Sequence, residues 1–169
     1  MRSIVFLIAL VFFVATCSKS KDPVPASNKA SSKTGDIKSD GFVLLQKHPQ
    51  DGELKSLLKS EALVGTKAGR KVFVYIKADW CPPCVKLRES LGDSRMKAAF
   101  HNTHIIQLDL NEYGSDKLDT EGLPSGSIPV FHEIDAKGRP TGRKIDGGAW
   151  GENIPKNMAP PLKAFFQAE

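Results

Sequence analysis

The sequence predicts an α/β domain, in which apolar strands alternate with amphipathic helices. Residues 71–76 are a run of β-branched and aromatic side chains without Gly or Pro, which is typical of a buried strand. Residues 104–110 have the same character and are expected to form a second central strand. Between them, Leu87 and Leu91 lie at helical spacing, apart from Val85 and with charged residues between them, which predicts a helix. Strands that alternate with helices favour a sheet covered by helices.

One more strand and one more helix are expected before residue 71. Residues 42–45 are expected to form the strand. Residues 53–67 are expected to form a helix that packs on the sheet, because apolar side chains recur there at helical spacing. These side chains are Leu54, Leu57 and Leu58.

The C-terminal part is expected to hold a strand pair and a last helix. Residues 130–134 and 143–145 are expected to pair as antiparallel strands. Residues 135–138, Asp-Ala-Lys-Gly, are suited to the turn that joins them. The last helix is expected to begin near Pro160 or Pro161, because Pro is tolerated in the first helical turn.

Two cysteines stand where the strand at 71–76 gives way to a helix, in the motif Trp80-Cys81-Pro82-Pro83-Cys84. The first amides of a helix lack intrahelical partners and its dipole is positive there, so a thiolate at Cys81 is favoured and its pKa is expected to be lowered. Pro82 and Pro83 fit the first helical turn and stiffen it. The spacing and the position together favour thiol redox chemistry.

Two other interpretations of Cys81 and Cys84 are half of a zinc site and a pair of inert thiols. A structural zinc site needs about four ligands. The remaining cysteine, Cys17, lies in a segment that we expect to be removed or anchored to a membrane, and the four histidines show no ligand-pair spacing. We therefore predict no metal and no cofactor beyond a redox-active disulfide between Cys81 and Cys84.

The run from residue 71 to residue 91 resembles the active-site region of thioredoxin-like proteins, in which a strand ends in Trp-Cys-x-x-Cys. The resemblance implies a three-layer sandwich with a central mixed β-sheet flanked by helices. The segment Gly-Ser-Ile-Pro-Val-Phe at 126–131 resembles the one in which this family places a cis-proline facing the cysteines. That role would fall to Pro129, with the backbone of Ile128 turned toward substrate.

A third segment, Lys-Ile-Asp-Gly-Gly-Ala at 144–149, resembles the family's penultimate strand, which ends in a Gly that lines the substrate groove. The resemblance assigns this place to Gly148 and places Trp80 beside the attacked sulfur. It also implies a mechanism in which the Cys81 thiolate attacks a substrate disulfide. Cys84, expected to be the more buried thiol, then resolves the mixed disulfide.

The motif differs from thioredoxin itself at two positions. Thioredoxin has a buried Asp six residues before its first cysteine, where this chain has Tyr75. Its partner Lys on the following strand corresponds to Gln107. The buried charge pair is therefore expected to be missing, and proton transfer must use water, Tyr75 or another group.

The N-terminus predicts export. Residues 4–15 form an apolar run after Arg2 that is too short to span a membrane but suits a signal peptide. The end of this run resembles a lipoprotein cleavage box, so we expect residues 1–16 to be a signal peptide and Cys17 to carry lipid. Ser18 after Cys17 then favours the outer membrane over the inner one, and ordinary cleavage would leave a soluble periplasmic protein.

Residues 17–40 are rich in Ser, Lys, Ala, Pro and Asp and are expected to be a flexible tether, which leaves residues 41–169 for one thioredoxin-like domain. The formal net charge is +5, but the basic residues are not interleaved with aromatic ones, which argues against nucleic-acid binding. The expected partners are disulfide-containing exported proteins, a membrane disulfide reductase as electron donor and the membrane itself.

The resulting prediction is an exported thiol-disulfide reductase. The absence of His between the cysteines and the Ile before Pro129 favour reduction over oxidation by family analogy. The alternatives are a disulfide oxidant or isomerase, a non-catalytic thioredoxin-like binding or chaperone module, and a carrier of a soft metal ion.

Overall fold

The protein was analysed as a computed structural model, which describes residues 36–38 and 41–168. The expected signal peptide, Cys17 and most of the expected tether lie outside the described residues.

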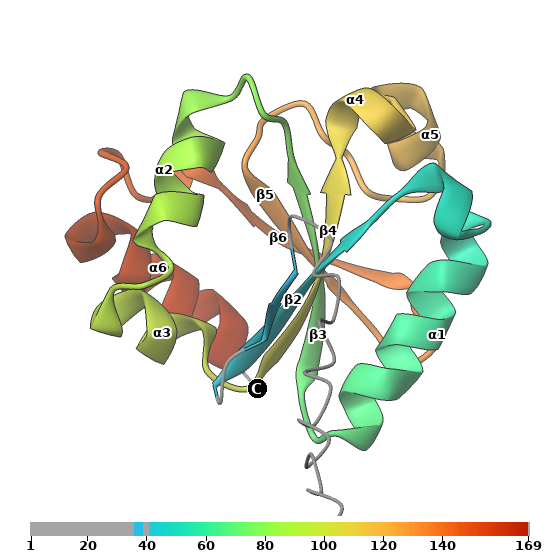
Figure 1. The fold of residues 1–169 in the computed structure, drawn as a ribbon, viewed down its shortest axis with the longest axis horizontal. Coiled ribbons are helices and arrows are strands. Elements are labelled where there is room, and N and C mark those ends of the chain that lie inside the picture. Colours follow the sequence, from blue (N-terminus) through green and yellow to red (C-terminus); the bar gives the residue numbers. More distant parts are fainter. Residues whose placement is uncertain (1–35, 39–40, 169) are drawn as a thin grey trace, which may run out of the picture. The chain divides into compact units, whose positions relative to one another are not determined.

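A mixed β-sheet forms the middle layer, with strand order β1-β2-β4-β3-β5-β6 (Figure 1). β2, β4 and β3 are parallel, whereas β1, β5 and β6 each pair antiparallel with a neighbour. The mixed sheet that the sequence predicted is therefore confirmed. The strands are β1 (Ile37–Lys38), β2 (Phe42–Lys47), β3 (Lys71–Lys77), β4 (Thr103–Asp109), β5 (Val130–Ile134) and β6 (Pro140–Asp146).

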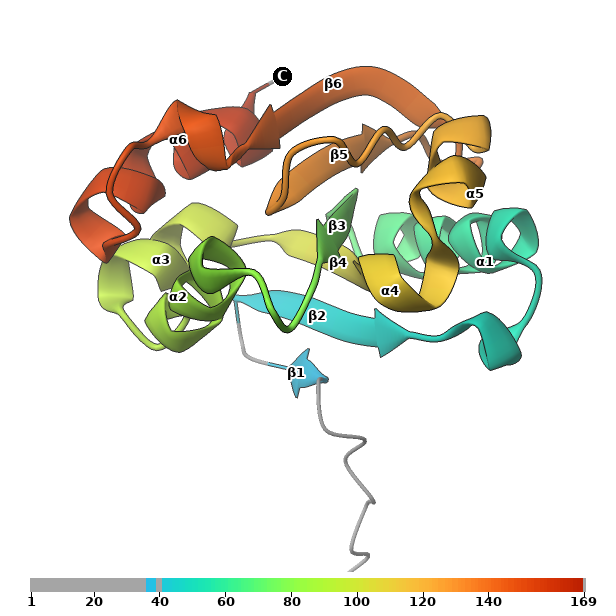
Figure 2. The same ribbon diagram turned by 90° about the horizontal axis from the view of Figure 1, so that it is seen from above.

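Helices cover both faces of this sheet, which confirms the three-layer α/β architecture. Helix α1 lies on one face, and α2, α3 and α6 lie on the other (Figures 1 and 2). Two short helices, α4 and α5, follow β4 at the carboxyl ends of the parallel strands. The helices are α1 (Leu54–Lys67), α2 (Pro82–Ser90), α3 (Ser94–Phe100), α4 (Leu110–Tyr113), α5 (Ser115–Thr120) and α6 (Pro155–Gln167).

Each face of the sheet has its own hydrophobic core. The core under α1 contains Leu54, Leu58 and the alternate β3 residues Val72, Val74 and Ile76. The core under α2, α3 and α6 is built on aromatic rings, most of which contact one another edge to face. It contains Phe42, Phe73, Tyr75, Phe100, Phe131 and Phe166. β3 is buried on both faces, because its alternate residues belong to the two cores. The end of the strand, and hence the cysteine motif that follows it, is therefore held in a fixed place.

Helix α6 begins at Pro155, five residues before the predicted start, so Pro160 and Pro161 lie inside the helix. Each proline removes one backbone donor. The turn before them is nevertheless helical because Met158 and Ala159 are buried in the aromatic core, so packing outweighs the unfavourable local propensity.

Strands begin earlier than the sequence indicated at two places. Ile37 and Lys38, at the end of the expected tether, pair with Leu44 and Val43 as β1. β6 begins at Pro140 instead of residue 143. An exposed edge strand lacks the apolar alternation that marks a half-buried strand, so the sequence pattern there is weak.

The turn between β5 and β6 packs directly on α1. Gly138 has a φ of +78°, and a Cβ atom there would lie 2.5 Å from the backbone nitrogen of Lys59. Gly142 has a φ of +89°, but no atom of the described residues lies within 4 Å of such a Cβ. We expect Gly138→Ala to lower the free energy of unfolding by about 3 kcal/mol or more, and Gly142→Ala by about 1 kcal/mol.

Urea unfolding of the two variants measures the difference. The matched φ values cancel the cost of the left-handed conformation, so the excess for Gly138→Ala reports the close approach to α1. Equal losses in the two variants would contradict this account of the contact.

A half-buried ion-pair network joins α1 to the sheet and makes stability depend on pH. Glu61 accepts hydrogen bonds from His104 at 2.9 Å and from Lys47 at 2.7 Å. These partners lower the pKa of Glu61 to about 2, the hydrogen bond from His104 contributing most. A carboxylate whose pKa is lowered on folding contributes its full stabilisation at pH values above its ordinary pKa of 4.5. This contribution is lost as the pH falls toward 2.

We expect Glu61→Gln to lower the free energy of unfolding by about 2 kcal/mol at pH 7 and by much less at pH 2. Glu112→Gln is the control, because Glu112 also pairs with a histidine, His48, but has a side chain that is 40% exposed. Glu112→Gln should lower the free energy of unfolding by less than about 1 kcal/mol. Denaturant unfolding at the two pH values measures both variants, and a pH-independent loss for Glu61→Gln would refute the network's role.

Candidate active site

The two cysteines lie at the point where β3 ends and α2 begins, as predicted. Cys81 is the N-cap of α2, and Pro82 and Pro83 occupy its first turn. Cys81 and Cys84 form a disulfide, with their Cα atoms 5.3 Å apart, a normal separation for such a bond. The backbone N–H of Cys84 donates to Cys81 Sγ at 3.2 Å. A free helix amide therefore faces the sulfur on which a thiolate would form.

Both cysteines are almost fully buried in the disulfide form, with exposed fractions of 2% for Cys81 and 3% for Cys84. The expectation that Cys84 would be the more buried of the two is not met. The reason is that Ile128 packs over the pair and its carbonyl oxygen lies 3.6 Å from Cys81 Sγ. Substrate access to Cys81 must therefore pass beside Ile128.

The peptide bond between Ile128 and Pro129 is cis, as the resemblance implied. Pro129 is buried and its carbonyl accepts a hydrogen bond from the N–H of Gly147 at 3.0 Å. A Cβ atom on Gly147 would lie 3.4 Å from Pro129 Cδ. Gly148, which the sequence singled out, is exposed and donates its N–H to Asp146 at 2.9 Å. The glycine that adjoins the proline loop is thus Gly147.

Trp80 is the exposed aromatic residue of the motif, with 64% of its surface accessible. Its indole Nε1–H donates to Asn111 Oδ1 on α4 at 3.0 Å, which fixes the ring beside the cysteines. Sequence reasoning missed Asn111, because nothing in its local pattern indicates a contact with Trp80. Of the two prolines, Pro82 is exposed and Pro83 is half-buried.

Beneath the disulfide, Tyr75 on β3 is in register with Gln107 on β4. These two positions correspond to the buried Asp and Lys of thioredoxin. Tyr75 is 2% exposed and its ring stacks on Phe131 at 4.5 Å. Burial raises the pKa of Tyr75, so its phenol stays neutral near pH 7. Gln107 donates through Nε2 to Gln46 on β2. The uncharged character expected at these two positions is observed.

A charge pair lies two residues farther along the same strands. Lys77 on β3 is in register with Asp109 on β4, and its Nζ donates to Asp109 Oδ2 at 2.5 Å. The same amine donates to Asp79 Oδ1 at 2.8 Å. Burial of the Lys77 amine lowers its pKa, but the hydrogen bonds and charges of the two aspartates outweigh burial, so the pKa is raised overall. The same hydrogen bond lowers the pKa of Asp79.

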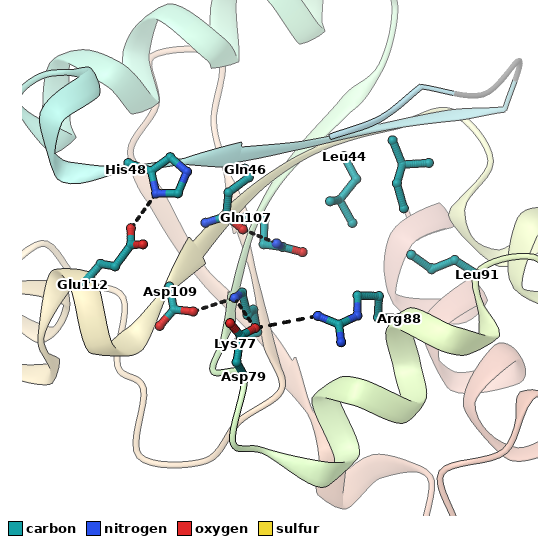
Figure 3. A pocket seen from close by; sticks show the side chains of 11 residues that line it. Leu44, Gln46, His48, Lys77, Asp79, Arg88, Leu91, Gln107, Asp109 and Glu112 are labelled. Carbon is teal, nitrogen blue, oxygen red and sulfur yellow. Dashed lines mark hydrogen bonds and ion pairs between the residues drawn. The ribbon is translucent and has the colours of Figure 1, made fainter. Parts of the chain in front are cut away.

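These residues line a cleft of about 400 Å³ next to the active site (Figure 3). Its polar groups are already paired with one another: Lys77 with Asp109, His48 with Glu112, and Gln107 with Gln46. Arg88 on α2 reaches across to Asp79, with Nη1 3.7 Å from Oδ1.

In the described part of the chain, no three His, Cys, Asp or Glu side chains gather in a way that could hold a metal ion. A search of the same residues finds no helix with the length and apolar character needed to cross a membrane.

The structure is similar to that of a disulphide isomerase from Xylella fastidiosa Temecula1, with a TM-score of 0.52 and 17% sequence identity over 72% of this chain and 95% of that one. A thioredoxin from Nicotiana alata, NaTrxh, gives a TM-score of 0.44 and 17% identity over 64% of this chain and 84% of that one. Trichomonas vaginalis thioredoxin gives a TM-score of 0.37 and 22% identity over 60% of this chain and 78% of that one.

Neither a family model nor a curated protein matches the sequence. Strand order, helix placement, the cysteine pair and the cis-proline, together with the likeness to the disulphide isomerase, define the thioredoxin-like fold. The fold that the Trp-Cys-x-x-Cys motif predicted is confirmed.

Proposed function

We propose that the protein is a thiol-disulfide oxidoreductase that reduces disulfides of exported proteins. The observation that carries the proposal is the Cys81–Cys84 disulfide at the N-terminus of α2, with the Ile128 carbonyl 3.6 Å from Cys81 Sγ. A pair that closes a disulfide over one helical turn can accept two electrons from a donor and pass them to another disulfide. A protein that only binds partners has no need for such a pair.

Reduction proceeds in two exchange steps. The Cys81 thiolate attacks one sulfur of the substrate disulfide, and the other substrate sulfur leaves as a thiolate with the bonding electron pair. Cys84 then loses its proton, and its thiolate attacks Cys81 Sγ. The bond between Cys81 and the substrate breaks, and the second substrate sulfur leaves as a thiolate. The substrate gains two electrons and takes up two protons from water, and Cys81–Cys84 ends as a disulfide.

The residues around the pair position the substrate. The Ile128 backbone beside Pro129 offers peptide groups to an extended segment of the substrate, and exposed Trp80 offers an apolar surface on the other side. Gly147 leaves the proline loop uncovered, and Gly148 is exposed next to it. These contacts would hold a substrate disulfide in line with Cys81.

The reductase direction rests on the sequence, which has no His between the cysteines and has Ile before Pro129. An exported dithiol enters an oxidising compartment, so it needs a dedicated donor, for which a membrane disulfide reductase has the required chemistry. The signal peptide at residues 1–16 and lipid on Cys17 would place the domain on the periplasmic side of a membrane, with the outer membrane favoured.

Disulfide isomerisation is the second candidate, and the likeness to the Xylella disulphide isomerase favours it. The two functions differ in the lifetime of the mixed disulfide. A reductase resolves it rapidly, whereas an isomerase leaves time for a substrate thiol to attack instead.

We expect Cys81→Ser to abolish the reduction of insulin by dithiothreitol-fed protein, because the attacking thiolate is lost. Cys84→Ser should lower turnover at least a hundredfold and accumulate a mixed disulfide with the substrate, because the resolving thiol is lost. Insulin turbidity and non-reducing electrophoresis measure the two effects.

Cys17→Ser is the matched control and should reduce insulin at the native rate. Full activity in Cys81→Ser would refute the proposed mechanism. Rapid repair of a scrambled ribonuclease by a protein that reduces insulin only slowly would select isomerisation over reduction.

A further inference from the structure

A small cavity of about 10 Å³ lies against Cys84 on the inner side of the disulfide. This volume is about the minimum that one water molecule needs. Its lining comes from β3, α2 and β4, so it is closed by the same elements that hold the cysteines. The lining residues are Tyr75, Lys77, Ala78, Cys84, Val85, Arg88 and Gln107.

The charges around this cavity are all positive. Lys77 and Arg88 are cations, and none of the described residues that line the cavity carries a carboxylate. The nearby carboxylates, Asp79 and Asp109, line only the wider cleft of about 400 Å³. Lys77, Arg88 and Gln107 line both spaces and therefore form the partition between them. Lys77 thus lines the cavity together with Cys84, and the carboxylates that pair with its amine line the cleft.

Lys77 is held in this partition by its two partners. Its side chain is 11% exposed and that of Asp109 is 8% exposed, so the pair is largely shielded from water (Figure 3). Asp79, which is 72% exposed, binds the same amine from the outer side. A charge held at low exposure acts on its neighbours more strongly than a solvated one, because the surrounding dielectric is lower.

The other two polar groups of the cavity lining carry no charge near pH 7. Gln107 has no ionisable group, and burial keeps the Tyr75 phenol neutral. The ionised residues that line this cavity together with Cys84 are therefore Lys77 and Arg88. Arg88 is exposed and lies 3.7 Å from Asp79, which weakens its effect.

We propose that Lys77, positioned by Asp109 and Asp79, stabilises the thiolate of Cys84 in the resolving step. The inference rests on the proposed function and names the group that serves this step in place of a buried carboxylate. Cys84 gives its proton to water, from which it passes to bulk solvent. The sulfur electron pair then forms the bond to Cys81 Sγ as the bond from Cys81 to the substrate breaks. The Lys77 cation makes the thiolate more available near neutral pH, which shortens the life of the mixed disulfide.

The test is a titration of Cys84 alone, in the full chain with Cys17→Ser and Cys81→Ala, followed by the ultraviolet absorbance of the thiolate. Adding Lys77→Met should move the titration midpoint to higher pH and lower the thiolate fraction at pH 7 about tenfold. Lys86→Met is the matched control, because Lys86 is a 62%-exposed lysine of α2 that does not line the cavity. It should leave the midpoint unchanged.

Two further variants separate an electrostatic role from a structural one. Lys77→Arg keeps the charge and should return most of the thiolate fraction. Asp109→Asn removes a counter-charge and should move the midpoint to lower pH, in the opposite direction to Lys77→Met. A purely structural role predicts that Lys77→Met and Asp109→Asn shift the midpoint in the same direction.

Equal midpoints for Lys77→Met and Lys86→Met, or shifts of the same sign for Lys77→Met and Asp109→Asn, would overturn the inference. If Lys77→Met does not fold, Asp109→Asn decides: a midpoint at lower pH supports the inference, and a midpoint at higher pH overturns it. The titration involves no substrate turnover. A native chain that fails to reduce insulin would thus refute the proposed function and leave the titration result unchanged. A titration that overturns the role of Lys77 would likewise leave the proposed function standing.

Discussion

The central position of β3 is the constraint on which the site depends. β4 on one side brings Asp109, and Asn111 just beyond it, to the cysteine motif, and β5 on the other side follows directly from the cis-proline. Both faces of β3 are covered by hydrophobic cores, so the strand cannot shift along its neighbours without exposing Phe73 or Val74. The register of three strands thus fixes where the Cys81 sulfur meets the Ile128 carbonyl.

The sheet face under α2 changes from apolar to charged toward the carboxyl ends of the strands. Phe73 and Ile105 lie in the aromatic core, Tyr75 and Gln107 follow as polar but uncharged groups, and Lys77 meets Asp109 where the cleft opens. This pair is largely shielded from water, so the cost of its burial must be offset by the contacts of Lys77 with Asp109 and Asp79. The chain thereby has a charge pair two residues beyond Tyr75 and Gln107, and under our proposal rapid resolution of the mixed disulfide is the kinetic consequence.

Sequence patterns predicted the features that are encoded locally. The apolar run of β3, the two cysteines at a helix start and the Ile-Pro pair each carry their signal within a few residues, and the structure places them together as expected. The partners that come from other elements could not be found this way. Asn111 beside Trp80, and Asp109 beside Lys77, meet through strand register, which a single sequence does not specify. The position of α6 was missed because core packing outweighs two prolines.

The most direct test of the account is the reduction potential of the Cys81–Cys84 pair in the full chain with Cys17→Ser, followed by Trp80 fluorescence in thiol redox buffers. Trp80 adjoins Cys81, so its emission should report the state of the pair. The account predicts one two-electron transition with a potential below about −230 mV. A potential above about −150 mV would contradict the reductase direction. The absence of any two-electron transition would contradict the redox function itself.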